Sequence, residues 1–524
     1  MNRQDRNLAG GAQGDRGATA SDTFTGNRAL EIEEALIFEI GRPDTAGVDW
    51  QDPPSVVPRL GGLTRTTRTG LPALSEPEVV RHYVRLSRQN YGIDSGIYPL
   101  GSCTMKHNPR LNERMARLPG FADIHPLQPL ATVRGALELI AELARWLREL
   151  TGMPAIAMTP KAGAHGELTG MMVIKAALRA RGEDRTVVLV PQSAHGTNPA
   201  TAALLGFRIE QIAARPDGTV DVAEVLSRLS SDTAAIMLTN PNTCGLFERD
   251  VVAIAEAVHG AGAYVYADGA NFNAIVGKVR PGDLGVDAMH INLHKTFSTP
   301  HGGGGPGAGP VALSGALAAF TPIPYVIADS NGLRFVENSD DAEPGATPLG
   351  RLCAFHGQMG MFVRALSYML SHGIDGMRQA SEDAVLSANY LRASLSDLMS
   401  LPFVDRPCMH EVLFDDAWLE GTGLTTLDFA KAMIDEGYHP MTMYFPLVVH
   451  GAMLIEPTES ESKESLDRFN RVLRALAGEA KAGKTERFAG APRFAPRRRL
   501  DETAAARKPV LRWKPKADVK QAAE

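Results

Sequence analysis

Strand-like and helix-like patterns alternate along the middle of the chain, from about Pro126 to Gly315. Short apolar runs such as 187–190 and 235–238 end at polar turns and are separated by stretches with helical spacing of apolar residues. Alternation of this kind is typical of a largely parallel sheet covered by helices. Open sheets of this class bind ligands at the carboxyl ends of their strands. The sequence therefore predicts an α/β fold with a site where these strands end.

Asp268 and Lys295 indicate which chemistry this region can support. Asp268 follows the apolar and aromatic run 263–267 and precedes Gly269, so we expect its carboxylate at the end of a strand. A desolvated lysine such as Lys295 can bind pyridoxal phosphate (PLP) as a Schiff base, and a buried carboxylate keeps the pyridine nitrogen of PLP protonated. The pair predicts a PLP enzyme. A turn aspartate and a surface lysine are the alternative.

Three further segments favour a cofactor site. Gly163, Ala164 and His165 lead into a helical pattern, and N–H groups at a helix start attract a phosphate; an ordinary strand-to-helix turn is the alternative. His195 follows the run 187–190, where its imidazole can stack on the pyridine ring, although a lone histidine is more often structural. Asn240 follows the run 235–238 and can reach the phenolic oxygen of the ring.

The run Gly302–Gly307 satisfies the pattern G-x-G-x-x-G of dinucleotide-binding folds. No strand pattern leads into it, however, and the following segment 310–314 does not open a helix. The motif therefore does not predict a dinucleotide site. We expect instead a backbone that approaches a ligand closely, directly after Lys295.

Composition limits the remaining possibilities. A chain of 524 residues, 44% of them hydrophobic, can bury a large core and form two or three structural units. The net charge of -6 gives no reason to expect nucleic acid or a membrane as a partner, and no apolar run approaches the roughly 20 residues that span a bilayer. The cysteines lack CxxC and metal-ligand spacing, so we expect reduced thiols in the cytoplasm and no metal; they are Cys103, Cys244, Cys353 and Cys408.

The chain is expected to have five regions. Its start lacks the apolar core of a signal peptide, and its end is rich in arginine and lysine. The expected regions are a disordered tail (1–30), an N-terminal helical arm (31–125), a large PLP-binding domain (126–315), a small C-terminal α+β domain (316–480) and a basic extension (481–524).

Several segments resemble one family of fold-type I PLP enzymes, the P-proteins of the glycine cleavage system. The resemblance runs from about residue 30 to 515 and implies an aspartate aminotransferase-like fold with a large, mostly parallel sheet domain. The segments that carry it are Tyr98–Lys106, Ala162–Glu167, Ser193–Pro199, His294–Phe297, His301–Gly307, His439–Pro446 and Ile455–Lys463.

The resemblance implies decarboxylation of glycine with transfer of the aminomethyl group to the lipoyl arm of the H-protein. The family contains fused chains and two-subunit forms, and this length fits the PLP-carrying second subunit. A first subunit and an α2β2 assembly are therefore expected partners. The implied residues are Lys295 as the Schiff-base lysine, Asp268 at the pyridine nitrogen, His195 on the ring, and Gly163, Ala164 and His165 at the phosphate. We also expect Asn240, Ala270 and His294 to contact the cofactor.

Two other functions stay open. Another fold-type I decarboxylase or aminotransferase would share the cofactor residues, although it would normally show an arginine for the substrate carboxylate, and none can be singled out. A non-catalytic subunit is the second possibility, but it would have no use for both Lys295 and Asp268.

Two segments of the resemblance have no assigned role. Tyr98–Lys106 is either a lid near the ligand or a subunit-interface loop with a buried Cys103. The acidic run within Ile455–Lys463 is interpreted as a solvated helix start, capped by Thr458 or Ser460.

Overall fold

The computed structural model describes residues 34–512, except 42–46, 48–50, 52–53, 55–56, 58, 68, 303–306, 331 and 496. The predicted tail 1–30 and the last residues of the basic extension lie outside the described residues. The chain forms two compact units. One comprises the described residues of Met1–Tyr91, Ile434–Gly437 and Glu486–Glu524, and the other comprises Gly92–Met433 and Tyr438–Thr485.

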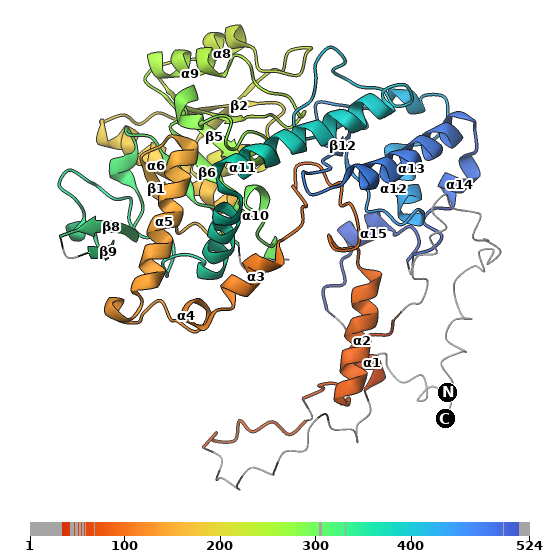
Figure 1. Ribbon diagram of the computed structural model, residues 1–524, viewed down its shortest axis with the longest axis horizontal. Helices are drawn as coiled ribbons and strands as arrows, with labels where there is room; N and C mark the ends of the chain where they lie inside the picture. Colours follow the sequence, from red (N-terminus) through yellow and green to blue (C-terminus); the bar gives the residue numbers. More distant parts are fainter. Residues whose placement is uncertain are drawn as a thin grey trace. The chain divides into compact units, whose positions relative to one another are not determined.

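A seven-stranded sheet forms the centre of the larger unit (Figure 1). Its strand order is β1-β7-β6-β5-β4-β2-β3, and only β7 runs antiparallel to its two neighbours. This is the largely parallel sheet that the alternating pattern predicts. The strands are β1 (Ala155–Ala157), β2 (Val187–Pro191), β3 (Arg208–Ile212), β4 (Thr233–Thr239), β5 (Tyr264–Gly269), β6 (Ala288–Ile291) and β7 (Val311–Leu313).

Both faces of this sheet are buried, which explains the continuous apolar runs in the sequence. Every residue of β4, β5 and β6 is buried. Neighbouring residues of β4 belong to different core clusters, Ile236 to one and Met237 to the other, because side chains alternate across a strand. Helix α6 packs on β5 and β6, and α9 packs on β5.

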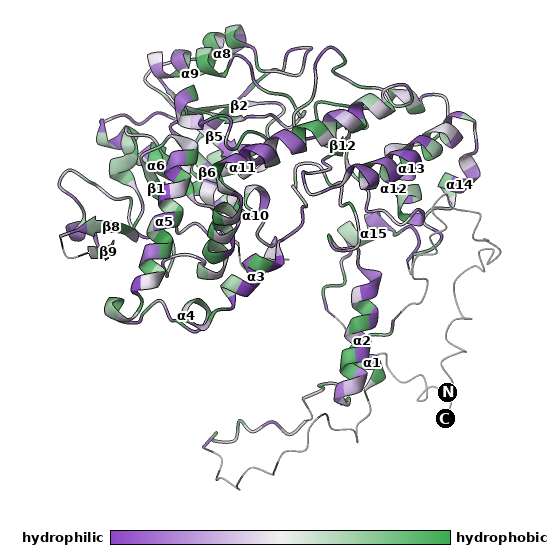
Figure 2. Cartoon of the chain, viewed as in Figure 1, coloured by the Kyte–Doolittle hydropathy of each residue, from purple (hydrophilic) through white to green (hydrophobic). Residues whose placement is uncertain are grey.

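The helices of the larger unit carry their apolar residues on the buried side. In α5, for example, Leu143 and Leu147 are fully buried while Arg145 is exposed. Figure 2 shows hydrophobic and hydrophilic residues side by side on this helix. The helices are α3 (Arg110–Ala116), α4 (Pro119–Ala122), α5 (Arg134–Thr151), α6 (Gly163–Ala180), α7 (Thr197–Leu204), α8 (Val222–Arg228), α9 (Val251–Gly260), α10 (Leu293–Thr296), α11 (Met359–Leu395), most of α12 (Thr426–Asp435) and α13 (Lys463–Lys481).

The C-terminal half of the larger unit contains a second, antiparallel sheet. Its strand order is β10-β12-β11, formed by β10 (Val412–Phe414), β11 (Thr442–Met443) and β12 (Met453–Ile455). Gly373 interrupts α11 with φ 63 and ψ -179, so two helices meet there. A hairpin of β8 (Tyr325–Asp329) and β9 (Gly332–Val336) completes the strands.

The regular elements described in the smaller unit are helices. Glu34 accepts hydrogen bonds from Arg85 of α2 at 2.7 Å, and these bonds lower the pKa of Glu34 to about 2. Ser75 and Glu78 form a capping box at the start of α2. Its helices are α1 (Ile37–Ile40), α2 (Glu76–Gln89), most of α14 (Thr485–Ala489) and α15 (Glu502–Arg507).

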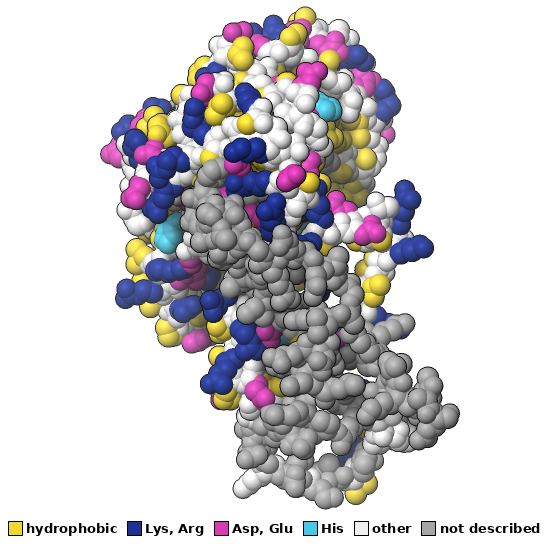
Figure 3. Space-filling view, turned by 90° about the vertical axis from the view of Figure 1, so that its right-hand side faces the viewer, with side chains coloured by type: hydrophobic (Ala, Val, Ile, Leu, Met, Phe, Trp, Pro, Cys, Tyr) yellow, Lys and Arg dark blue, Asp and Glu magenta, His cyan; other side chains and the backbone are white. Residues whose placement is uncertain are grey.

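The surface carries charges of both signs. On the face in Figure 3, Lys and Arg side chains lie interspersed with Asp and Glu side chains. Among the described residues, no helix is both long and apolar enough to cross a membrane.

Candidate functional site

A cavity of about 340 Å³ lies where β4, β5 and β6 end, and it brings together most of the predicted site residues. A volume of this size is typical of sites for small ligands. The predicted residues that line it are Gly163, Ala164, His195, Asp268, Ala270, His294 and Lys295.

Asp268 lies at the end of β5 and is only 4% exposed. One carboxylate oxygen accepts a hydrogen bond from the backbone N–H of Ala270 at 2.9 Å and lies 3.4 Å from His290 Nε2. The other oxygen accepts from the amide of Asn198 at 3.1 Å, in the orientation that also satisfies Glu167. The carboxylate is therefore fixed by hydrogen bonds from several sides.

Lys295 lies on α10, immediately after β6. Its Nζ donates a hydrogen bond to the backbone carbonyl of Ser102 at 2.8 Å. The rings of His294 and His301 lie beside it, with centroids 4.8 Å apart. Burial lowers the pKa of His294 to about 3, and the neighbouring His301 and Lys295 contribute to this shift. The imidazole of His294 is therefore neutral at neutral pH.

A turn at Gly101–Thr104 places the Ser102 carbonyl over Lys295. Ser102 and Thr104 have φ values of 62 and 51, a conformation that costs energy unless other contacts hold it. Two carboxyl groups from far along the chain supply those contacts. Glu411 accepts from the N–H of Ser102 and Glu456 accepts from the N–H of Thr104, each at 2.8 Å.

These carboxyl groups are buried, which corrects the interpretation of the acidic run in Ile455–Lys463. Glu456 is fully buried, and Glu459 forms a 2.6 Å ion pair with the buried Lys106. Helix α13 begins only at Lys463, and its cap is Ser462, not Thr458 or Ser460. The run is therefore interior structure up to Thr458, and only its end, with Ser460, Ser462 and Lys463 exposed, is a solvated helix start. The pattern of acids and hydroxyls was misleading because both kinds of segment share it.

His195 follows β2 and belongs to a short polar network. Its Nδ1 lies 2.8 Å from the hydroxyl of Thr197, which in turn lies 2.7 Å from Oε1 of Glu167. Burial lowers the pKa of His195. Its ring meets Phe445 edge-on, with centroids 5.7 Å apart.

The start of α6 supplies backbone to the cavity. A Cβ atom on Gly163 would lie 2.3 Å from Oδ1 of Asn292, so this position admits only glycine at its present spacing. The first N–H groups of a helix have no partner within the helix and are suited to bind an anion.

The predicted His165 and Asn240 do not line the cavity. Nδ1 of His165 accepts from the N–H of Lys161 at 3.2 Å, and Oδ1 of Asn240 accepts from the N–H of Glu248 at 3.0 Å. Other lining residues were not predicted, although many of them follow strands in the sequence. They are Ser102, Ala162, Glu167, Thr197, Thr239, Thr243, Asn271, His290, Asn292 and His301.

The cavity is suited to a polar ligand. Ser102 and Thr239 line it, and their buried hydroxyl oxygens have no hydrogen-bond partner among the described residues. Buried hydroxyls are normally satisfied, so these two indicate polar groups of a ligand or water. A buried acid, an amine and a helix start around one cavity match the pyridine nitrogen, the aldehyde and the phosphate of PLP.

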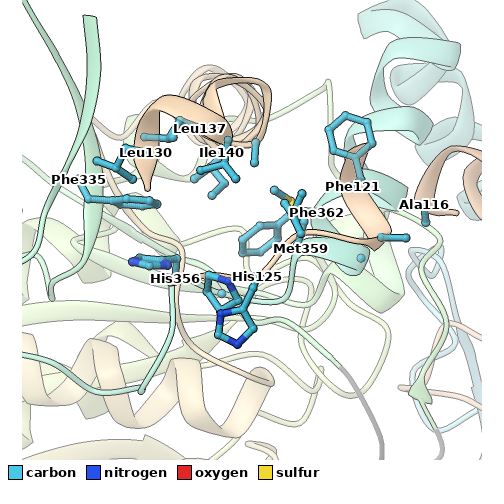
Figure 4. A pocket seen from close by; sticks show the side chains of 17 residues that line it. Ala116, Phe121, His125, Leu130, Leu137, Ile140, Phe335, His356, Met359 and Phe362 are labelled. Carbon is cyan, nitrogen blue, oxygen red and sulfur yellow. The ribbon is translucent and has the colours of Figure 1, made fainter. Parts of the chain in front are cut away.

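A second cavity, of about 320 Å³, lies between α4, α5, β9 and the start of α11 (Figure 4). Apolar side chains such as Leu137, Ile140 and Phe362 dominate its lining, and His125 and His356 also point toward it. His356 stacks on Phe335 and lies 2.6 Å from Glu337. The described lining of this second cavity contains no lysine, aspartate or glutamate, so it does not offer the amine and the acids that line the first cavity.

The four cysteines are free thiols. Cys103, in the turn over Lys295, is partly buried, and burial raises its pKa to about 11. It is therefore a thiol rather than a thiolate at neutral pH. The two acids that hold the turn, Glu411 and Glu456, form a buried group with His410, and the possible ligand atoms of the three residues lie within 4.8 Å of one another.

Two family models match the chain. Residues 380–492 match "Glycine dehydrogenase, C-terminal domain", and residues 166–304 match "Aminotransferase class-V". The second match contains Asp268 and Lys295.

Relatives with assigned names extend this likeness to nearly the whole chain. The chain is 67% identical over 510 residues to a probable glycine dehydrogenase (decarboxylating) subunit 2 of Caulobacter vibrioides, covering 97% of each chain. It is 51% identical to a protein of the same name from Kosmotoga olearia, covering 87% of this chain and 93% of that one.

Solved structures agree on the fold. A glycine decarboxylase (P-protein) of the glycine cleavage system, in inhibitor-bound form, matches with a TM-score of 0.66 at 22% identity, covering 80% of this chain and 93% of that one. A glutamate decarboxylase of Lactobacillus brevis matches with a TM-score of 0.62 at 14% identity, covering 80% and 96%. The aspartate aminotransferase-like fold predicted from the sequence is confirmed.

Proposed function

Since the chain belongs to the family of glycine dehydrogenase (decarboxylating) subunit 2, we propose that it carries out the PLP-dependent decarboxylation of glycine in the glycine cleavage system. The observation that carries the assignment of the site is the single cavity that Asp268 and Lys295 share at the ends of β5 and β6. Retention of both residues supports a catalytic subunit rather than a structural one.

PLP supplies an electron sink for the bond between Cα and the carboxylate of glycine. The residues that would hold it are all in the larger unit. The N–H groups at the start of α6 would bind its phosphate, His195 would lie on its ring, and Asp268 would face its pyridine nitrogen. Lys295 would supply the amine that attaches it to the protein.

Asp268 is suited to hold a proton on the pyridine nitrogen. It is buried, and the side-chain amide of Asn198 and the backbone N–H of Ala270 donate hydrogen bonds to its two oxygens. A fixed negative charge at this place stabilises positive charge on the ring nitrogen. This is preorganised electrostatic stabilisation, often the largest contribution to catalysis.

Lys295 must be able to move a proton as well as to form a bond. The Ser102 carbonyl accepts from its Nζ and can hold the amine whenever the amine is free. The neutral imidazoles of His294 and His301 lie around it and add no competing positive charge. The cavity therefore keeps the amine close to the place where substrate binds.

The complete reaction requires two partner proteins. Loss of CO₂ leaves an electron pair on the remaining carbon, and this carbon forms a bond to one sulfur of a lipoyl disulfide while the S–S bond breaks. The second sulfur takes a proton, so carbon is oxidised and the disulfide is reduced. We infer that a lipoylated H-protein supplies the disulfide. The name of the relatives implies a partner subunit, and we infer a subunit 1 in an α2β2 assembly.

Exchange of labelled bicarbonate into the carboxyl group of glycine tests the proposal. We expect exchange when this chain, loaded with PLP, is mixed with a candidate subunit 1 and lipoylated H-protein, and we expect none without them. No exchange in the full mixture, with PLP visibly bound, would contradict the assignment and favour another amino-acid substrate. Release of CO₂ from other amino acids by the same mixture would then identify it.

A further inference from the structure

Glu167, Thr197 and His195 form a connected chain of polar atoms at the wall of the cavity. The Thr197 hydroxyl lies 2.7 Å from Glu167 Oε1 and 2.8 Å from His195 Nδ1. The backbone N–H of Thr197 points at the same Nδ1 from 3.3 Å. Glu167 sits on α6, and the other two residues lie at the start of α7, so the chain joins two elements of the fold.

The protons in this chain can be counted. A threonine hydroxyl has one proton to donate. If Glu167 were ionised, Thr197 would donate that proton to it and would then present only lone pairs to His195 Nδ1. A proton on Nδ1 would satisfy the hydroxyl but would point at the Thr197 N–H as well. One contact of the three would be repulsive in either arrangement.

A protonated Glu167 removes this conflict. Its acid proton is then donated to the Thr197 hydroxyl, and the hydroxyl donates its own proton to His195 Nδ1. The Thr197 N–H also donates to Nδ1, so all three contacts pair a donor with an acceptor. The ring proton of the neutral His195 must then lie on Nε2.

The surroundings of Glu167 favour the protonated acid. Glu167 is 3% exposed, and burial, followed by the neighbouring charge of Asp268, raises its pKa to about 8. The Asn198 amide donates to both acids, at 2.9 Å to Glu167 and 3.1 Å to Asp268. Because like charges this close disfavour double ionisation, one acid keeps its charge and the other keeps its proton. The titratable groups around Glu167 are Asp268 and Tyr266 of β5, His195 beside α7, His290 of β6 and Lys295 of α10.

We propose that Glu167 is a positioning residue that acts in its protonated form and fixes, through the Thr197 hydroxyl, the orientation and the Nε2–H form of His195. This inference rests on the proposed function of His195 as the residue that lies on the PLP ring. It adds a role for a buried acid at the wall of the cavity that acts through Thr197 and His195. It also gives the two neighbouring carboxyl groups different protonation states: Asp268 carries the negative charge, and Glu167 carries the proton.

The test compares four variants of the full-length, PLP-loaded chain. Glu167→Gln replaces the acid by an amide whose N–H donates to Thr197 at any pH. Thr197→Val removes the hydroxyl without changing size or charge, and Thr197→Ser restores a hydroxyl. Glu420→Gln, an exposed position outside the site, is the control for loss of a carboxylate.

The primary readout is the protonation of the two His195 nitrogens, measured by ¹⁵N NMR with labelled histidine and assigned by comparison with His195→Gln. We expect the Nε2–H form in the wild type below about pH 8, and a change in the signals as the pH rises through about 8. Glu167→Gln should keep the Nε2–H form and lose this change. Thr197→Val keeps the backbone N–H that points at Nδ1 but has no hydroxyl to connect Glu167 to the ring, so it should lose the change near pH 8, while Thr197→Ser and Glu420→Gln should match the wild type.

The inference is overturned if Glu167→Gln titrates as the wild type does, or if Thr197→Val still shows the change near pH 8. The same variants are then compared in the bicarbonate exchange reaction. We expect kcat to fall about tenfold in Thr197→Val and to recover in Thr197→Ser, since one hydrogen bond is worth about that factor. The NMR result does not need glycine turnover, so failure of the proposed function leaves it readable.

Discussion

Lys295 is held between two regions of different construction. The sheet side consists of Asp268, His195 and the start of α6, which follow strands or open a helix of the central sheet. The turn side consists of Gly101–Thr104, which has no strand of its own. Buried acids hold the turn side from positions 309 and 352 residues further along the chain.

The difference shows two ways to position a functional group. On the sheet side, backbone pairing and burial on both faces fix the strand ends, and the side chains follow from their positions. On the turn side, two residues with positive φ are stabilised by hydrogen bonds to buried carboxyl groups. We therefore expect the sheet side to tolerate changes that preserve the strands, and the turn side to depend on single polar contacts.

Replacing Lys295, which both regions contact, should have the largest effect. Lys295→Ala removes the amine that binds PLP, so we expect bicarbonate exchange to fall by at least about 10³-fold and the visible absorbance of bound PLP to disappear. Lys278→Ala is the matched control, because Lys278 forms an exposed ion pair with Glu382. Equal activity of Lys295→Ala and the control would contradict the role of Lys295. The sheet side and the turn side would then have no shared functional residue.

Asp268→Asn tests the sheet side. The substitution keeps the shape of the side chain but removes its charge, so we expect exchange to fall by about 10²–10³-fold while the protein stays folded. The melting temperature and the amount of PLP bound should be measured together with the rate. Asp283→Asn, at an exposed ion pair with Arg280, should leave the rate unchanged. A rate within tenfold of the wild type would show that the charge of Asp268 does not matter.

The sheet side was largely predictable from the sequence. The run 235–238 is part of β4, and the run 263–267 leads to Asp268 at the end of β5, as the apolar patterns indicate. Strand ends meet at one edge of a parallel sheet, so local patterns were enough to bring Asp268, Lys295 and His195 together. Asn240 was harder to predict, because its side-chain oxygen bonds to the N–H of Glu248 instead of lining the cavity.

The turn side was not predictable from local patterns. Nothing near Glu456 or Glu411 in the sequence distinguishes a buried acid from a solvated one, because the distinction depends on the distant turn that each acid contacts. Glu167 presents the same difficulty. It lies within a segment that carried the family resemblance, yet its role depends on Thr197 and on Asp268, which come from other elements.

Gly101→Ala tests how closely the turn side is packed. An added Cβ would lie 2.4 Å from Leu454 Cγ and 2.7 Å from the carbonyl oxygen of Leu454, so the turn must shift. We expect a loss of about 1–3 kcal/mol in the free energy of unfolding and roughly tenfold lower exchange, because the Ser102 carbonyl moves away from Lys295.

Gly92→Ala is the matched control for this packing, because an added Cβ there meets nothing within 4 Å. Thermal unfolding and exchange should be measured for both variants. If Gly101→Ala behaves as Gly92→Ala does, the turn is not held closely, and the difference between the two regions is smaller than the structure indicates.

Glu411→Gln should give the smallest effect. It reports on whether the carboxyl group of Glu411, which holds the turn side, is protonated. Burial, followed by the charge of Glu456, raises the pKa of Glu411 well above its ordinary value of 4.5. The folded protein therefore binds a proton more tightly than the unfolded chain does, and its stability falls as the pH rises above about 4.5. Glutamine cannot ionise, so the variant should escape this loss and still accept the hydrogen bond from Ser102.

The measurement is the melting temperature of Glu411→Gln minus that of the wild type, followed from about pH 4.5 upward. We expect this difference to grow with pH and to reach one to a few degrees near neutral pH, whereas Glu420→Gln, at an exposed position, should give a constant difference. A difference that shrinks with pH would mean that Glu411 is stabilised as a carboxylate. The turn would then be held by charge rather than by a neutral hydrogen bond, and the turn side would resemble Asp268 on the sheet side.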